Sequence, residues 1–180
     1  MCQLWVNLPK KHKMTKPKYQ PILNENIPVI KLPLGSTDES AVATARIIAG
    51  EMGDTKGAAK TFSPVQMWDI TLPRKDSEID LDFPADHNCI LFVRRGKVEV
   101  LSGSEGELKA SELGPQDVAL MRIDGSEKVR IKVNQNNSSI MVLGGEPLDE
   151  PIAAHGPFVM TTQDEINQAI SDYRMGKMGR

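Results

Sequence analysis

The sequence predicts an all-β protein, and three observations lead to this prediction. Short stretches rich in apolar and β-branched residues recur between residues 41 and 143, separated by Gly, Asn and Asp. In several of them, apolar and charged residues alternate one by one, as in a strand with one face in a core. No stretch with helical spacing interrupts the series, so no parallel sheet with crossover helices is expected. Seven or eight such strands indicate a sandwich or a barrel.

The stretch 88–101 is the centre of this prediction. It reads Asn-Cys-Ile-Leu-Phe-Val-Arg-Arg-Gly-Lys-Val-Glu-Val-Leu. The apolar run 89–93 is too short for a helix and predicts a strand buried on both faces, whereas Val98 and Val100 alternate with charged residues. With Gly96 as the turn, the stretch predicts a β-hairpin.

The other strands of the predicted barrel follow from the same patterns. In residues 78–83, three acids alternate strictly with Ile79, Leu81 and Phe83, so the acids should face solvent. In residues 65–72, the side chains of Trp68, Ile70 and Leu72 should share one face. The remaining strands are expected at 41–49, 107–110, 118–123, 128–133 and 139–143.

The two ends of the chain have different patterns. Residues 3–8 predict a short apolar strand carrying Trp5, with no strand before it to pair with, and residues 10–38 form a Pro-rich linker with one short strand at 29–34. At the other end, Thr162 and Glu165 have the spacing of a capping box. A helix is therefore expected at 163–174, with an apolar stripe that packs on the barrel, formed by Ile166, Ala169, Ile170 and Tyr173.

Composition excludes several classes of protein. The 180 residues include 22 basic and 24 acidic side chains, a net charge of −2, so no overall field attracts nucleic acid or an anionic membrane. No apolar run is long enough for a membrane span, and no signal peptide is recognisable. Two cysteines, Cys2 and Cys89, form neither a disulfide framework nor a zinc site, which favours a reducing, intracellular compartment. Five lysines in residues 10–18 suggest either a nuclear-import patch or, as we favour, a solvated linker.

Side chains that carry chemistry are scattered. The histidines, His12, His87 and His155, are far apart in sequence, and no phosphate loop or nucleophile elbow is present. His87 precedes the hairpin strand and is the strongest candidate ligand, although a structural or turn histidine is the simpler interpretation. Asp80 and Asp82 share a strand face that suits either a cation or solvent. Cys89 should be buried and inert. These residues favour a binding module over an enzyme.

Four strings of residues resemble the pirin family. They are Cys-Gln-Leu-Trp-Val-Asn-Leu-Pro at 2–9, Lys-Met-Thr-Lys-Pro-Lys-Tyr-Gln at 13–20, Gly-Glu-Pro-Leu at 145–148 and His-Gly-Pro-Phe-Val-Met-Thr-Thr at 155–162. Pirins are two-barrel members of the cupin superfamily. The resemblance implies a remnant strand of the first barrel plus a linker at 1–38, a C-terminal cupin-type jelly-roll barrel at 39–148, and an extension with a helix at 149–180.

The resemblance also implies where a metal would lie. Complete pirins hold iron through three histidines and a glutamate that precede the segment resembling residues 3–8, so this chain resembles a truncated pirin. Within the second barrel, the corresponding positions fall on Asp82, Pro84, Asn88 and Lys128, a poor set of ligands. His87 is one residue out of register and should point to the opposite face. We therefore expect no metal, cofactor or catalytic residue in this chain.

Function follows from the resemblance as an expectation. Complete pirins are nuclear iron proteins that modulate transcription regulators, and some are quercetin dioxygenases. We expect a non-catalytic, pirin-like protein of the nucleus or cytoplasm that contacts transcription or signalling proteins and binds neither nucleic acid nor membrane. Self-association through residues 1–10 is expected as well. The alternative is a metal-dependent quercetin 2,3-dioxygenase-like enzyme.

Overall fold

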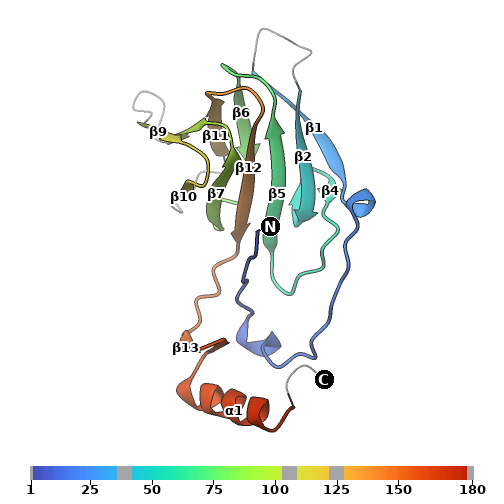
Figure 1. The fold of residues 1–180 in the computed structure, drawn as a ribbon, viewed down its shortest axis with the longest axis vertical. Helices are drawn as coiled ribbons and strands as arrows, with labels where there is room; N and C mark the ends of the chain where they lie inside the picture. The colour runs from blue at the N-terminus through green and yellow to red at the C-terminus, as the bar shows by residue number, and fades with distance from the viewer. Residues whose placement is uncertain (1, 36–41, 103–108, 122–127, 178–180) are drawn as a thin grey trace. The chain divides into compact units, whose positions relative to one another are not determined.

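The computed structural model describes residues 2–35, 42–102, 109–121 and 128–177. The chain forms two compact units, which are described separately (Figure 1). One unit is continuous and comprises Ile22–Pro147. The other combines both ends of the chain, Met1–Pro21 and Leu148–Arg180.

The continuous unit, called the barrel unit, is built from two antiparallel sheets. The larger sheet has the strand order β1 (Val29–Pro33), β2 (Val42–Ala49), β5 (Val65–Leu72), β12 (Ser138–Gly145), β7 (Asn88–Arg95) and β10 (Val118–Met121). The smaller sheet has the order β6 (Glu78–Asp82), β11 (Lys128–Val133), β8 (Val98–Ser102) and β9 (Lys109–Leu113). A short ribbon of β3 (Glu51–Met52) and β4 (Thr55–Lys56) and a 3₁₀ turn η2 (Asn24–Asn26) complete the unit. The predicted all-β fold is confirmed.

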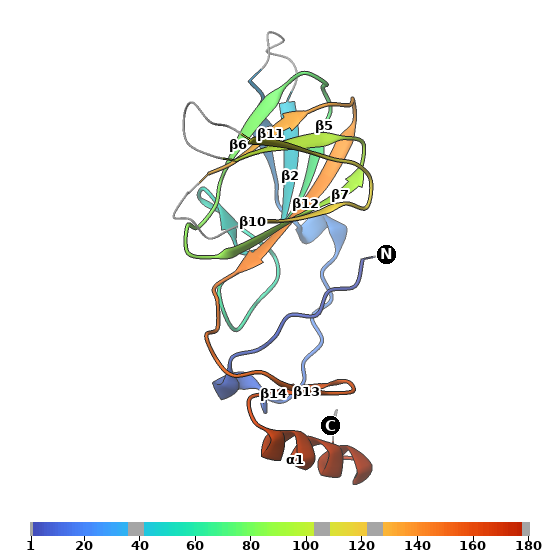
Figure 2. The ribbon, with the colours of Figure 1, turned by 90° about the vertical axis from the view of Figure 1, so that its left-hand side faces the viewer.

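The two sheets enclose one core. Figure 2 shows β6 and β11 in a layer in front of β2 and β5. Inward side chains of both sheets meet in a single buried cluster that includes Trp68, Leu91 and Ile131. The predicted alternation in residues 78–83 is confirmed, because Ile79 and Leu81 are buried and the acids of β6 are exposed. Burial of such apolar side chains, at about 1.5–3 kcal/mol each, is the main stabilising contribution.

The predicted hairpin at 88–101 is wrong. β7 belongs to the larger sheet and β8 to the smaller one, and the two strands do not pair. The chain crosses between sheets at Gly96, which has φ +79°. A Cβ at this position would lie 2.2 Å from the Ser138 side-chain oxygen, so only glycine fits this corner. Both strands were predicted correctly, but a turn glycine cannot by itself distinguish a hairpin from a crossing between sheets.

The expectation that residues 89–93 are buried on both faces is also wrong. Burial alternates along β7, with Cys89, Leu91 and Val93 in the core and Ile90 and Phe92 half-buried on the other face. The apolar run therefore places large side chains on the outside of the larger sheet.

Several predicted boundaries shift by a few residues. The short strand expected at 29–34 is β1, and it pairs with β2 in the larger sheet. Position 41, positions 107–108 and positions 122–123, which were assigned to strands, lie outside the described residues. Two short strands, β13 (Ala153–His155) and β14 (Phe158–Met160), were not predicted.

The second unit, called the terminal unit, contains β13, β14, the helix α1 (Gln163–Arg174) and a 3₁₀ turn η1 (Lys10–His12). The predicted capping box is present, with Thr162 as N-cap. Ile166 and Ala169 are buried, but Ile170 is only half-buried and Tyr173 is exposed. The helix packs on the β13–β14 hairpin, where Tyr173 meets the ring of Phe158 edge-on at 6.0 Å. The barrel was predicted as its support because this hairpin was not recognised.

The predicted strand at 3–8 is wrong. Residues 2–9 are irregular, and no strand in the described part of the chain pairs with them. Trp5 is 72% exposed and Val6 54% exposed. β propensity alone does not make a strand without a partner edge. Among the described residues, no helix is long and apolar enough to cross a membrane.

Candidate functional site

The positions where the resemblance would place metal ligands lie around the end of β6 and the start of β7. Asp82 ends β6 and is exposed, opposite Lys128 of β11 in the cross-strand register. Asn88 begins β7 and is also exposed. The structure thus brings a carboxylate opposite an ammonium group, which is the arrangement of a solvated charge pair across two strands.

The side chain of His87 is largely buried at this end of the barrel unit. His87 lies in the turn between β6 and β7, where its backbone N–H donates to the carbonyl oxygen of Pro84 (3.1 Å). Its ring meets Phe83 edge-on at 6.4 Å, and Phe83 meets Trp68 edge-on at 5.4 Å. The expectation that His87 faces away from the expected ligand positions assumed a strand, but His87 lies in a turn, where strand alternation does not apply.

This aromatic cluster contains two buried polar atoms without a partner. The His87 side chain is 8% exposed, with Nε2 4.0 Å from a carboxylate oxygen of Asp86. Its Nδ1 and the Nε1 of Trp68 make no hydrogen bond in the structure. Gly144 lies under the Phe83 ring, since an added Cβ would come within 2.4 Å of it. The ring therefore fills the space beside the histidine.

The residues of this region do not fit an iron ion. His87 offers one imidazole nitrogen, and the neighbouring indole is a donor that cannot ligate a metal. Burial raises the pKa of Cys89 to about 12, so its thiol remains protonated. Within the described ranges, no three His, Cys, Asp or Glu side chains come together as a metal site requires.

Asp80 is engaged by an arginine. The Arg130 guanidinium on β11 donates from Nε to one carboxylate oxygen (2.8 Å) and from Nη2 to the other (3.1 Å). These hydrogen bonds hold the pKa of Asp80 below its usual range, despite some desolvation. A carboxylate bound on both oxygens by a cation is a poor ligand for a second cation, so the face shared with Asp82 is a solvated ionic face.

A second ionic cluster lies on the outer face of the larger sheet. Asp69 of β5 is largely buried and lies between Arg46 of β2 and Arg94 of β7. Nη1 of Arg46 donates to Oδ2 (3.1 Å), and Nη2 of the same guanidinium donates to the side-chain oxygen of Asn24 (2.7 Å). Nη2 of Arg94 lies 2.7 Å from Oδ1 as an ion pair without hydrogen-bond alignment. Sequence reasoning missed this cluster because its members come from three strands.

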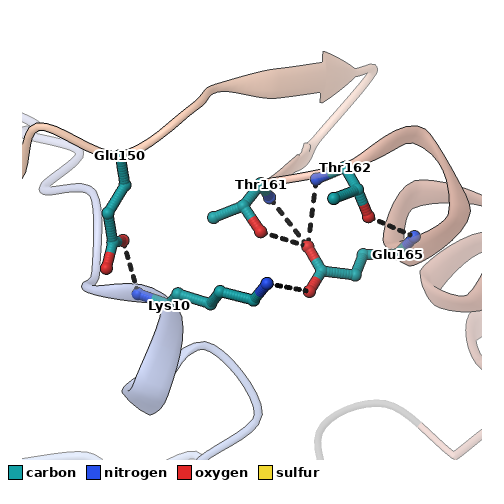
Figure 3. A network of polar contacts seen from close by, with 5 residues as sticks. All are labelled: Lys10, Glu150, Thr161, Thr162 and Glu165. Carbon is teal, nitrogen blue, oxygen red and sulfur yellow. Dashed lines mark hydrogen bonds and ion pairs between the residues drawn. The ribbon is translucent and has the colours of Figure 1, made fainter.

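A third network belongs to the terminal unit (Figure 3). One carboxylate oxygen of Glu165 accepts hydrogen bonds from the Thr161 hydroxyl (2.6 Å), the Thr161 N–H (2.9 Å) and the Thr162 N–H (3.0 Å). Its other oxygen lies 3.8 Å from Nζ of Lys10, whose backbone N–H donates to Glu150 (2.7 Å). The Thr161 hydrogen bonds hold the pKa of Glu165 below its usual range. The helix cap thus also connects the two ends of the chain.

We predict that Glu165→Gln loosens this connection and reduces its pH dependence. A carboxylate with a depressed pKa stabilises the folded state above its unfolded pKa, about 4.3, and this contribution is lost as pH falls through the lower folded pKa. In the wild type, hydrogen-exchange protection of the α1 amides should therefore fall in acid. In Glu165→Gln, protection should already be lower at neutral pH and change less on acidification.

The matched control for this prediction is Asp164→Asn, which removes a charge from the same helical turn. It leaves the three hydrogen bonds of Glu165 intact and should keep the acid-dependent loss of protection. Equal exchange profiles for the two variants would contradict the assigned role of Glu165.

Comparison with known proteins identifies the class of this fold. Two antiparallel sheets around one core form the jelly-roll β-sandwich of cupin proteins. The structure of quercetin 2,3-dioxygenase from Acinetobacter baumannii matches 97% of the chain, with a TM-score of 0.81 and 38% sequence identity. Residues 67–179 match the model of the pirin C-terminal cupin domain. The chain belongs to the pirin family.

Relatives extend along the whole chain. The Pseudomonas aeruginosa protein named "Putative quercetin 2,3-dioxygenase PA2418" is 40% identical over 100% of this chain and 57% of its own length. Human pirin is 34% identical over 98% of this chain and 56% of its own length. The Acinetobacter structure is covered to 55%. The chain thus spans little more than half the length of these relatives.

Proposed function

We propose that this chain forms the non-catalytic cupin barrel of a quercetin 2,3-dioxygenase-like pirin. The observation that carries this proposal is the 40% identity along the full chain with a protein named for that reaction. The dioxygenase relationship therefore has more support than the regulatory role expected from the resemblance alone. We assign this barrel a non-catalytic role because the aromatic cluster around His87 does not fit a metal.

In this proposal, the barrel contributes a rigid scaffold and not the oxygen chemistry. The ring of Phe83 packs between Trp68 and His87, where a hollow would be required for a substrate or an ion. The buried thiol of Cys89 remains neutral and unreactive. We therefore infer that the chain binds no iron through the described residues.

We predict that the isolated chain neither retains iron nor consumes quercetin. After incubation with ferrous iron and gel filtration, metal analysis should find far less than one iron per chain, and the absorbance of quercetin under air should not fall beyond a metal-only blank. Treatment with a chelator should leave the melting temperature unchanged. The Acinetobacter enzyme, assayed in parallel, is the positive control.

The outcome that would contradict this prediction is stoichiometric iron together with quercetin loss. If both were abolished by His87→Ala and retained in His155→Ala, the barrel itself would hold the catalytic metal. His155 is the matched control because it is an exposed histidine of the terminal unit.

A second candidate function is regulation through protein contacts. It is favoured by the outer face of the larger sheet, where apolar side chains lie beside the Arg46–Asp69–Arg94 cluster. We propose partners among transcription or signalling proteins of the nucleus or cytoplasm, without direct contact to nucleic acid or membrane. A two-hybrid or co-precipitation experiment with the intact chain tests this candidate. It is repeated with a chain in which a side chain of this face is substituted.

A further inference from the structure

The outer face of the larger sheet carries two rows of apolar side chains. Cross-strand pairs define the first row across β5, β12, β7 and β10, as Met67, Leu143, Ile90 and Leu120. The adjacent row continues from Asp69 through three apolar residues, Met141, Phe92 and Val118. Paired residues share one face of a sheet, so these seven apolar side chains lie on one face, called the outer patch. Within it Met141 is buried, Val118 and Leu120 are exposed, and the other four are half-buried.

The outer patch lies opposite the core. Its strand neighbours Trp68, Leu91 and Val142 are fully buried on the inner face. On the outer face, Leu120 is 72% exposed and Val118 58% exposed. A solvated antiparallel sheet face normally carries polar side chains, and contiguous apolar patches on soluble proteins mark interaction sites.

The charges on this face are mainly basic. The strands of the larger sheet present four bases outward and one acid, Asp69; the bases are Lys31, Arg46, Arg94 and Arg95. Asp69 is shared by both arginines and is largely buried between them. An arginine has five N–H donors, so this shared carboxylate orients the guanidinium groups and leaves donors for another acceptor. Arg, Met and Phe are also enriched at protein interfaces.

We propose that the outer patch binds a partner protein that presents apolar side chains flanked by carboxylates. Charge decides against a second copy, because two such faces would bring like charges together. It also disfavours an anionic membrane, since lipid-binding clusters contain about four to eight Lys or Arg without acids, whereas two of the four bases of this face are paired with Asp69. The proposal deepens the second candidate function by naming its surface, and it does not depend on whether the partner regulates transcription.

The test uses a phage-displayed library of random peptides selected on the intact chain. Selected sequences should combine large apolar residues with Asp or Glu. Fluorescence anisotropy then measures how tightly a synthetic peptide of the consensus sequence binds to the chain and to its variants. The affinity should fall at least about tenfold for Leu120→Asp and for Arg94→Gln, and binding to the unchanged chain should weaken at high salt. A second peptide, in which Asn and Gln replace the Asp and Glu, should bind the unchanged chain as weakly as the original peptide binds Arg94→Gln.

Matched controls separate this surface from general stickiness. Ile152→Asp places the same charge at another exposed apolar residue, which belongs to the terminal unit. Arg130→Gln removes an arginine of the smaller sheet, which donates to the Asp80 carboxylate (2.8 Å). Both controls should retain binding, and circular dichroism should show that all four variants fold.

Five outcomes would overturn the proposal. Three of them come from the selection: it yields no peptides, it yields peptides without acids, or it yields peptides that bind equally well to Leu120→Asp. Self-association of the free chain that Leu120→Asp abolishes would instead assign the patch to a second copy. Binding to phosphatidylserine vesicles that the same variants abolish would assign it to a membrane. If no peptide binds but the iron and quercetin experiments give the results predicted above, the proposed binding surface is rejected and the proposed dioxygenase relationship still stands.

Discussion

Trp68→Ala should lower the free energy of unfolding of the barrel unit by about 3–5 kcal/mol. The indole is 1% exposed and packs edge-on against Phe83 in the centre of the core. Truncation removes the largest buried side chain and leaves a cavity that the β-sheet framework fills only in part. This is a large fraction of the ~5–15 kcal/mol that stabilises a typical domain.

The chain contains its own matched control, because its other tryptophan is exposed. Trp5 is 72% exposed, so Trp5→Ala should change stability by less than about 0.5 kcal/mol. Urea unfolding followed by far-UV circular dichroism measures both variants. The fluorescence of Trp5→Ala should report a buried indole, and that of Trp68→Ala a solvated one. Equal unfolding midpoints would contradict the assigned core.

Trp68→Phe refines the same prediction. The indole Nε1 has no hydrogen-bond partner in the structure, and a buried unsatisfied donor costs about 1–3 kcal/mol. Phenylalanine removes this donor and keeps an aromatic ring against Phe83. We therefore expect Trp68→Phe to be much less destabilising than Trp68→Ala.

The second large effect concerns self-association of the chain. We predict that Trp5→Ser with Val6→Ser converts an associating chain into a monomer. Both side chains are largely exposed, together with part of Leu4. Burying a large apolar side chain contributes about 1.5–3 kcal/mol, so loss of two should raise the dissociation constant at least roughly a hundredfold. Because residues 3–8 are not a strand, side-chain burial is the expected cause and edge pairing is not.

Sedimentation velocity over a concentration series measures this effect. The control is Met14→Ser with Tyr19→Ser, which removes two exposed apolar side chains from the same terminal segment but outside residues 1–10. This control should associate like the wild type. A monomeric wild-type chain, or equal dissociation by both double variants, would contradict the prediction.

The sequence alone determined the elements with a regular period. In residues 78–83, strict alternation of acids with apolar residues specified both the strand and its buried face, since side chains in a strand point to opposite sides. The capping box and the helix at 163–174 were likewise predictable, because Thr162 and Glu165 interact within one turn. Such signals are local, so they can be recognised without knowledge of the partner element. The pirin family was identified from ordered strings of residues for the same reason.

Only the tertiary structure decided which elements meet. Gly96 predicted a turn, but the clash of a Cβ with Ser138, a residue far along the chain, shows it to be a corner between two sheets. The Arg46–Asp69–Arg94 cluster and the rows of the outer patch depend on strand order, which no local pattern specifies. Residues 3–8 have strand composition and yet remain irregular, because a strand forms only where a partner edge accepts its backbone hydrogen bonds.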